Sequence, residues 1–292
     1  MKNQICAVLS TYNGEKYIRK QIDSILNQTY KVDKILIIDD VSTDNTINIL
    51  KEYSSKYSEV ECVFNDKNVG PTVNFFNGLK MVDGDYIVFC DQDDIWFPEK
   101  IFEQLSHLKN GELDSRYVAS FHNAVLIDSD NATVQNSYWQ YRKLNFEKQN
   151  FEKSLSRNIM TGCTIMINRN FAKLINENLK TYENIIFHDH FISLLSYSIA
   201  KVVPISKPLM YYRDHNSSVT SKKNTNMISK VIKNLILLKD NKYLDGNILQ
   251  AEKFKNDFKS LLDDQSLAAL NKFINLKKKN KIFQIFWQFK NK

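Results

Sequence analysis

Short apolar runs alternate with amphipathic stretches over the first 90 residues of the chain. The runs have the length and β-branched content of buried strands, and they lie at residues 5–9, 35–38, 60–64 and 86–90. Between them, apolar residues recur at helical spacing, and Gly70-Pro71 marks a break before the last of these helices. This series predicts an α/β fold of the Rossmann-like kind, with a mostly parallel central sheet and helices on both faces.

The pattern is less regular in the second half of the chain. It predicts three further strands and one helix, at residues 117–127, 162–167, 201–205 and 188–199 respectively. After Thr220 the chain is rich in lysine, and residues 228–238 and 248–262 form amphipathic patterns. We therefore expect one α/β domain at residues 1–220 and a helical C-terminal extension at residues 221–292.

The charge is unevenly distributed. The whole chain carries a net charge of +7, but residues 221–292 contain 16 lysines and 6 acidic residues, so the positive charge is concentrated there. This asymmetry indicates an anionic surface or partner for the extension and argues against nucleic acid as a partner of the α/β domain.

Cysteine usage and the N-terminal residues bear on where the protein works. The four cysteines, at positions 6, 62, 90 and 163, follow no metal-binding spacing and are typical of reduced thiols in the cytosol. The first apolar run is too short for a signal peptide, and no stretch approaches the length of a transmembrane helix. The sequence therefore predicts a cytoplasmic protein.

Polar clusters follow the predicted strands: Thr11–Tyr12, Asp39–Asp40 and Asp91–Asp94. Ligands of parallel sheets gather at the carboxyl ends of the strands, so these clusters predict one binding site. Asp91 and Asp93 are two residues apart and would point the same way in extended backbone. Such carboxylates repel unless a cation lies among them, and Mg²⁺ or Mn²⁺ prefers these oxygens. The alternative is a solvated acidic turn before a helix that begins near Asp94 or Pro98.

Four motifs, in the right order, carry a resemblance to a known family. They are residues 11–15 (Thr-Tyr-Asn-Gly-Glu), residues 37–44, residues 91–96 (Asp-Gln-Asp-Asp-Ile-Trp), and the pair 188–189 followed by residues 211–219. From Ile5 to about Val219 the chain resembles the family-2 glycosyltransferases, which have the GT-A fold. Its acidic motif is most similar to that of rhamnosyltransferase-like bacterial members.

The resemblance implies an inverting, metal-dependent transfer of a sugar from a nucleotide donor to a hydroxyl group. The first candidate is L-rhamnose from dTDP-rhamnose, and a UDP-hexose or UDP-N-acetylhexosamine is the alternative donor. The implied acceptor is a bacterial surface polysaccharide or a lipid-linked glycan.

The resemblance also assigns residues to the donor. Those expected to bind the nucleotide sugar are Thr11, Tyr12, Glu15, Asp40, Asn74, Asp91 and Arg213. Asp40 would accept a hydrogen bond from the N–H of a uracil or thymine ring, and the planar guanidinium of Arg213 would bind phosphate. For the cation, the family pattern ranks Asp93 above Asp91, and His215 would complete the metal shell.

Asp189 is the expected general base, because an attacking hydroxyl must lose its proton on the acceptor side. The structural alternative is a carboxylate favoured by the dipole of the helix that it begins. His188 and His190 are expected beside it on the acceptor side. His190 stands where the family usually has an aromatic residue, often tryptophan, which puts the acceptor specificity in doubt.

The end of the chain combines lysines at 277–279 and 281 with an apolar, aromatic stretch at residues 282–289. On a helix this pattern is typical of an element lying on anionic lipid, which would place the protein at the inner face of the cell membrane. The alternative is packing on the catalytic domain or on a second subunit, as in a homodimer.

Other functions fit the residues less well. A nucleotidyltransferase normally has a glycine-rich, basic phosphate loop after the first strand, and residues 11–16 do not form one. A glycosidase would use two carboxylates but would need neither a nucleotide pocket nor a metal. A non-catalytic scaffold at the membrane would not need the intact Asp91, Asp93 and Asp189.

Overall fold

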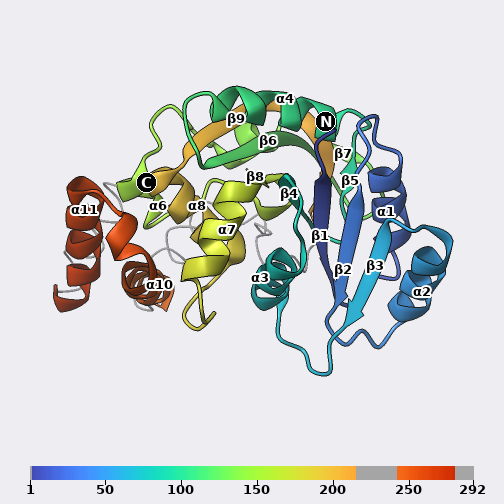
Figure 1. Cartoon of the computed structure of the whole chain (residues 1–292), viewed down its shortest axis with the longest axis horizontal. Coiled ribbons are helices and arrows are strands. Elements are labelled where there is room, and N and C mark those ends of the chain that lie inside the picture. The colour runs from blue at the N-terminus through green and yellow to red at the C-terminus, as the bar shows by residue number, and fades with distance from the viewer. Residues whose placement is uncertain (1, 215–241, 280–292) are drawn as a thin grey trace, which may run out of the picture.

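The computed structural model describes residues 2–214 and 242–279 (Figure 1). Its strands are β1 (Ile5–Thr11), β2 (Lys34–Asp39), β3 (Val60–Phe64), β4 (Tyr86–Cys90), β5 (Ile95–Trp96), β6 (Val118–Ile127), β7 (Thr133–Gln135), β8 (Met166–Asn168) and β9 (Lys201–Arg213). Within the described residues they form one sheet in the order β3-β2-β1-β4-β8-β6-β9-β5, and β7 pairs with β6.

Helices surround this sheet. They are α1 (Ile18–Leu26), α2 (Thr46–Lys56), α3 (Pro71–Met81), α4 (Lys100–Glu112), α5 (Tyr138–Arg142), α6 (Phe151–Ser154), α7 (Arg169–Asn178), α8 (His188–Ile199), α10 (Lys242–Phe258) and α11 (Asp264–Ile274). The described residues also contain three short 3-10 turns: η1 (Gly162–Thr164), η2 (Lys259–Leu261) and η3 (Asn275–Lys278).

The first half of the sheet is parallel, as predicted. β1 pairs with β2 and β4, and β2 pairs with β3, all in parallel register. Successive side chains of a strand point to opposite faces. Val8 and Phe89 therefore pack with α3, whereas Leu9 and Val88 pack with α1 and α2. Both faces are buried, which explains why these strands are continuous apolar runs in the sequence.

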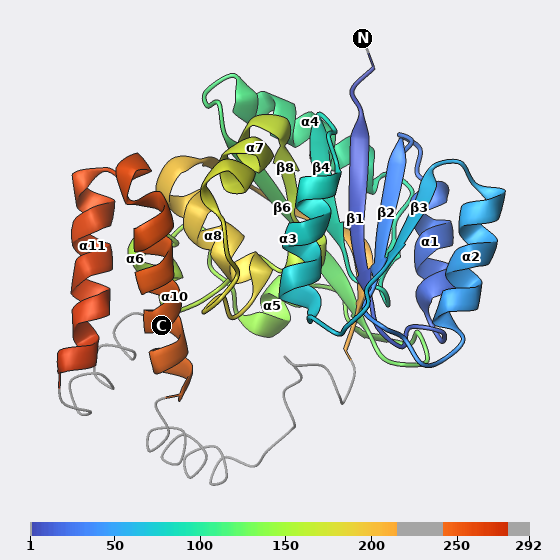
Figure 2. The same ribbon diagram turned by 60° about the horizontal axis from the view of Figure 1, so that its bottom comes forward.

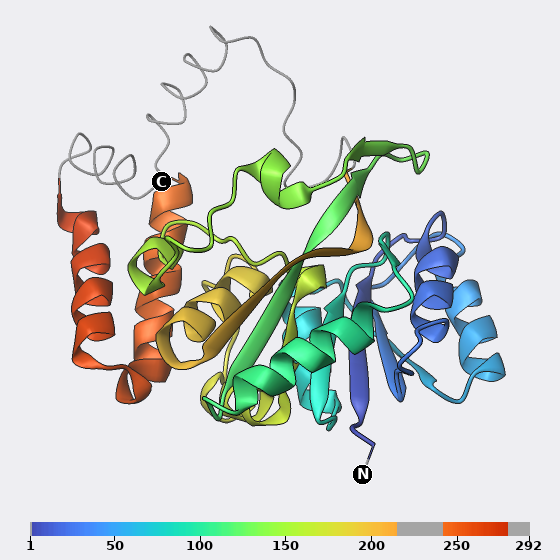
Figure 3. The same cartoon turned by 90° about the horizontal axis from the view of Figure 1, so that it is seen from above.

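The second half is mixed. β8 is antiparallel to β4 and β6, while β9 runs parallel to β6, beside it over most of its length (Figure 3). The strand predicted at 201–205 continues to Arg213, through Pro204 and Pro208. Proline is tolerated there because β5 pairs with β9 only beyond these positions, at Met210 and Tyr211.

The strand predicted at 162–167 was wrong in its first half. Residues 162–164 form the turn η1, in which the backbone N–H and the hydroxyl of Thr164 both donate to the Thr161 carbonyl, at 2.9 and 2.6 Å. The apolar residues of this stretch are buried, and burial alone does not distinguish a strand from a buried turn.

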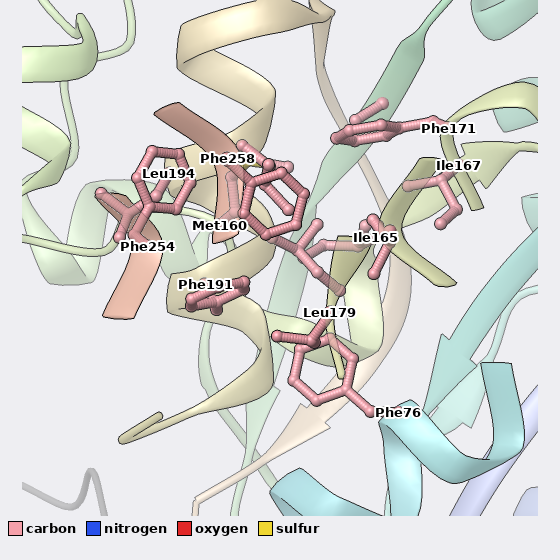
Figure 4. Close-up of a cluster of buried hydrophobic side chains, with 14 of the residues drawn as sticks. Phe76, Met160, Ile165, Ile167, Phe171, Leu179, Phe191, Leu194, Phe254 and Phe258 are labelled. Atoms are coloured by element: carbon pink, nitrogen blue, oxygen red, sulfur yellow. The ribbon is translucent and has the colours of Figure 1, made fainter. Parts of the chain in front are cut away.

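The C-terminal helices α10 and α11 share the core of the α/β domain (Figure 2). The Phe254 ring of α10 lies 5.7 Å from the Phe191 ring of α8 and 5.8 Å from the Phe151 ring of α6, between ring centroids (Figure 4). The amphipathic stretch predicted at 248–262 falls in α10 and η2.

Several predictions for the C-terminal part concern residues that the structure does not describe. The expected boundary at residue 220, the amphipathic pattern at 228–238 and the aromatic stretch at 282–289 lie outside the described residues. Among the residues that are described, no helix has both the length and the apolar character needed to cross a bilayer.

Candidate active site

The predicted nucleotide-side residues meet at the carboxyl edge of the parallel strands, and Gln92 joins two of their loops. Its Oε1 accepts hydrogen bonds from the Thr11 hydroxyl, at 2.6 Å, and from the Tyr12 backbone N–H, at 2.9 Å. Its Nε2 donates to the Tyr12 carbonyl at 3.2 Å. The loops after β1 and β4 are thereby held together, while the Tyr12 side chain stays 49% exposed.

Gln92 was missed by the sequence analysis. The available signal was an amide in the middle of three carboxylates, which can both donate and accept hydrogen bonds. Gly14 reflects the same junction, because a Cβ atom there would lie 2.5 Å from Gln92 Oε1 and 2.8 Å from Thr11 Oγ1.

Asp40 is buried at the end of β2 and organises the turn before α3. Its Oδ1 accepts from Asn65 Nδ2 and the Val69 N–H, at 2.8 and 2.9 Å, and its Oδ2 accepts from the Gly70 N–H at 2.8 Å. Gly70 has a φ of 82°, a conformation that glycine adopts without strain. Asn74 is also buried, and its Oδ1 accepts from the same Asn65 Nδ2 at 2.8 Å. Contact of Asp40 and Asn74 with a nucleotide stays a prediction.

Glu15 lies in the loop after β1, where it was expected. Its Oε2 accepts from the Asn45 N–H at 2.8 Å, at the start of α2, and its own N–H donates to Asp44 Oδ2 at 3.1 Å. These reciprocal bonds fix the loop against α2, so the contacts seen for Glu15 are structural.

The acidic motif contains a turn at residues 92–93 and is not the extended segment that was expected. Ligand atoms of Asp91, Asp94 and Cys163 lie within 4.8 Å of one another. Asp94 was not among the predicted site residues, yet it is 1% exposed, and its Oδ2 has no hydrogen-bond partner within the described residues. Asp93 is outside this group of three but close enough for its charge to act on both carboxyl groups.

Burial makes the acidic group unusual. Burial, together with the charges of Asp93 and Asp189, raises the pKa of Asp91 to about 7. Burial, Asp93 and Asp91 raise the pKa of Asp94 well above its usual range. The Cys163 thiol also has a strongly raised pKa through burial, so it is protonated at neutral pH. A partly buried carboxylate, Asp91, and a buried one, Asp94, whose Oδ2 has no hydrogen-bond partner among the described residues, fit a hard divalent cation.

A buried lysine contacts the backbone of Cys163, one of the three residues in this group. Lys100 of α4 is fully buried; its Nζ lies 2.7 Å from His122 Nε2 and donates to the Cys163 carbonyl at 3.1 Å. It also lies 4.4 Å from the centre of the Trp96 ring, which is itself buried as a packing residue. Burial lowers the Lys100 pKa to about 8. The sequence analysis missed Lys100, whose signal was a lysine on the apolar face of its helix.

The acceptor-side prediction centres on Asp189, in the first turn of α8. Its Oδ2 accepts from the Gly162 N–H at 3.2 Å, and its Oδ1 from the His190 N–H at 2.6 Å. Burial raises the pKa of Asp189 to about 6. Because the charge of Asp189 raises the pKa of Asp91, the two carboxyl groups lie near each other, although they are far apart in the sequence.

His188 and His190 flank Asp189 in the first turn of α8. The His188 ring stacks on Phe75 with centroids 3.9 Å apart, and burial lowers its pKa to about 3. Its Nε2 has no hydrogen-bond partner in the described part of the chain, and a Cβ atom on Gly162 would lie 2.7 Å from it. His190 Nε2 faces the Ser154 carbonyl at 2.7 Å. Both are buried, which leaves their predicted role toward an acceptor untested.

Arg213, at the end of β9, is bound by protein groups. Its Nε, Nη1 and Nη2 donate to the Asp93 carbonyl, the Asp128 carbonyl and Asn131 Oδ1, at 2.8, 2.7 and 2.8 Å. Its backbone N–H donates to Asp94 Oδ1 at 3.1 Å. Arg213 thus anchors the acidic turn to β9, and its contact with phosphate stays a prediction. His215 lies outside the described residues.

Comparisons with known proteins show the family to which the chain belongs. Residues 6–175 match the family model described as glycosyl transferase family 2. The chain is 31% identical over 229 residues to dTDP-rhamnosyl transferase RfbG of Shigella flexneri, and the match covers 72% of each chain.

Solved structures show the same fold. TarS (residues 1–349) of S. aureus, in complex with UDP, has a TM-score of 0.59 and 17% identity, covering 94% of this chain and 71% of that one. The mannosyltransferase PcManGT of Pyrobaculum calidifontis, in complex with GDP-Man and Mn²⁺, has a TM-score of 0.53 and 14% identity, covering 100% and 85%.

Proposed function

Because the chain belongs to glycosyl transferase family 2, and is therefore a glycosyltransferase, we propose that it moves a sugar with inversion from a nucleotide donor to an acceptor hydroxyl. The observation that carries this proposal is the meeting of two carboxyl groups at the sheet edge. Asp91 follows β4, Asp189 lies in the first turn of α8, and the charge of Asp189 raises the pKa of Asp91. Strongly perturbed carboxyl groups gathered in this way are typical of catalytic sites.

Asp189 is proposed as the general base. The N–H groups of Gly162 and His190 orient its carboxylate, and its pKa of about 6 leaves it deprotonated at neutral pH. That raised pKa makes it a stronger base than an ordinary aspartate. In this proposal Asp189 accepts the proton of the acceptor hydroxyl as that oxygen attacks the anomeric carbon, and the bond to the nucleoside diphosphate breaks.

Asp91 and Asp94, with Asp93 beside them, would hold Mg²⁺ or Mn²⁺. When bound, the ion supplies positive charge that offsets the charge developing on the departing diphosphate. The protein contributes the fixed geometry: Arg213 holds the turn from β9, and Lys100 holds the backbone of Cys163 beneath it.

Rhamnose from dTDP-rhamnose is the first donor that we propose, supported by the 31% identity to RfbG. A UDP-sugar is the alternative, since a structure of similar fold binds UDP. The proposed acceptor is a bacterial surface polysaccharide or a lipid-linked glycan. A lipid-linked acceptor would suit a protein held at the inner face of the membrane by its lysine-rich C-terminal part.

The test is a thermal-shift panel of dTDP- and UDP-sugars, each with and without Mn²⁺. A ligand that binds the folded state raises the melting temperature according to RT ln(1 + [L]/Kd), so the true donor should give the largest increase, and only with the metal. Product formation with that donor and an acceptor extract then measures transfer. The absence of a shift with every nucleotide sugar would refute the proposal.

A further inference from the structure

The C-terminal helix α10 reaches the segment that carries Asp189 through one buried side chain. Gln250 is fully buried, and its Oε1 accepts from the Ile186 N–H at 2.9 Å. Its Nε2 lies 3.1 Å from His190 Nδ1. One amide therefore bonds both ends of a five-residue segment in which Asp189 is the fourth residue.

The hydrogen-bonding pattern fixes the orientation of this amide. A backbone N–H can only donate, so the oxygen of Gln250 must face Ile186 and the NH₂ group must face His190. Nδ1 of His190 then has to accept, which leaves the proton on Nε2, where it is donated to the Ser154 carbonyl at 2.7 Å. Reversing the amide would place a donor against the Ile186 donor. Gln250 thus holds His190 neutral and in one tautomer.

The residue that Gln250 contacts, His190, is hydrogen-bonded to the Asp189 carboxylate. The His190 N–H donates to Asp189 Oδ1 at 2.6 Å, so any shift of His190 moves a bond that orients Asp189. The helix backbone is also close: a Cβ atom on Gly246, one turn before Gln250, would lie 3.2 Å from Ile186 Cδ1. The Gln250 bond is thus part of a tight contact between α10 and the residues before α8.

We propose that Gln250 is a positioning residue for transfer, through which the C-terminal extension sets the Ile186–His190 segment and the carboxylate of Asp189. This inference rests on the proposed role of Asp189 as the base. It also explains what contacts His190, which stands where the family usually has an aromatic side chain. In this chain the histidine pairs with Gln250 of the C-terminal extension.

The test uses the full chain and the variants Gln250→Leu and Gln250→Glu, with Leu249→Ala as the control, since Leu249 is exposed on the same helix. For Gln250→Leu we expect turnover at saturating substrates to fall about 10- to 100-fold, as displaced catalytic groups do. The donor affinity should change less than twofold. Amide hydrogen exchange of Ile186 should accelerate, and the ring ¹⁵N shifts of His190 should lose the pure Nε2–H pattern.

Gln250→Glu keeps an acceptor for Ile186 and replaces the NH₂ group by an oxygen. His190 should then take up a second proton, visible as imidazolium ¹⁵N shifts, and turnover should again fall. If Gln250→Leu fails to fold, Gln250→Glu still tests whether Gln250 is a positioning residue. Wild-type turnover and unchanged His190 shifts in a folded Gln250 variant would overturn the proposal.

The two proposals can fail separately. If Asp189→Asn transfers sugar at the wild-type rate, the base assignment fails, whereas the exchange of Ile186 and the shifts of His190 still report whether Gln250 sets the segment.

Discussion

The nucleotide side and the acceptor side of the site are built in opposite ways. On the nucleotide side, the polar groups of Thr11, Asp40 and Asn74 each have protein partners from a neighbouring loop. On the proposed acceptor side and in the acidic turn, two buried polar atoms, His188 Nε2 and Asp94 Oδ2, have no hydrogen-bond partner among the described residues.

This difference between the two sides fits the separate roles proposed for them, binding of the donor on one side and reaction on the other. A binding surface benefits from groups that are already held in place, because less ordering is required when the ligand binds. A reacting centre benefits from groups whose burial shifts their pKa toward the working pH. The acceptor side therefore carries an unfavourable electrostatic arrangement that the rest of the fold must stabilise.

The largest effect is expected from Asp189→Asn, which removes the proposed general base on the acceptor side. The amide has the size of the carboxylate but cannot take a proton, so transfer should fall by about 10²- to 10⁴-fold. The thermal shift with donor and Mn²⁺ should stay as in the wild type. Loss of donor binding in this variant would mean that the two sides cannot be separated.

Gln92→Ala should weaken donor binding with little effect on the acceptor side. It removes three hydrogen bonds between the loops after β1 and β4, and we expect a cost of about 1–2 kcal/mol in donor binding. Titration calorimetry should then give a donor Kd about 5- to 30-fold weaker. Turnover at saturating donor should change little. Gln92→Glu keeps the acceptor oxygen and should lie between the two; a donor Kd unchanged in Gln92→Ala would contradict the comparison.

The metal should stabilise the protein more as pH rises. The folded pKa values of Asp91 and Asp189, about 7 and about 6, lie above the ordinary value near 4, so the protonated forms favour the folded state. That stabilisation is complete below about pH 4 and is lost as pH rises through 6 and 7. Metal-free protein should therefore melt at a lower temperature at pH 8 than at pH 5.5.

Mn²⁺ binds the deprotonated carboxylates, so the increase in melting temperature that it causes should be larger at pH 8. The expected size is about 2–4 °C for each kcal/mol of binding. Asp91→Asn serves as the control: its metal-free form should be more stable at pH 8 than the wild type, and its response to Mn²⁺ should be weak. Equal shifts at both pH values in the wild type would argue against the cation site.

The smallest effect tests the close contact at Gly14. In the wild type, Gly14→Ala places a methyl group against Gln92 Oε1 and should weaken donor binding by about 1 kcal/mol. In the Gln92→Ala background that contact is gone, so the same substitution should cost less. A double-mutant cycle on the donor Kd measures the difference, and purely additive effects would mean that Thr11 alone limits the space.

The sequence predicted the parallel half of the fold well. Strands buried on both faces are uninterrupted apolar runs, so β2, β3 and β4 were located to within a residue or two. The turn η1 was misassigned because the residues that follow Gly162 are as apolar as a strand. The end of β9 was missed because Pro208 suggests a break, and only the sheet order shows that it lies beside an unpaired edge.

Within the proposed site, residue type and spacing predicted candidate chemical groups, whose roles stay predictions, but not the residues that contact them. Asp91 and Asp189 follow from motif positions. Gln92, Lys100 and Gln250 act through partners that are distant along the chain, such as Tyr12, Cys163 and His190. Asp94 was not predicted, because the sequence analysis assumed extended backbone around Asp91 and Asp93, where the structure has a turn.

The shared core of α6, α8 and α10 has a consequence for biosynthesis. The ring of Phe254 packs against Phe151 and Phe191, which are synthesised about 100 and about 60 residues earlier. A nascent chain that has reached only the end of β9 thus exposes these rings, a surface prone to aggregation and suited to chaperones. Folding of the acceptor half must wait for α10, so translation of residues 244–276 sets the moment at which the enzyme can mature.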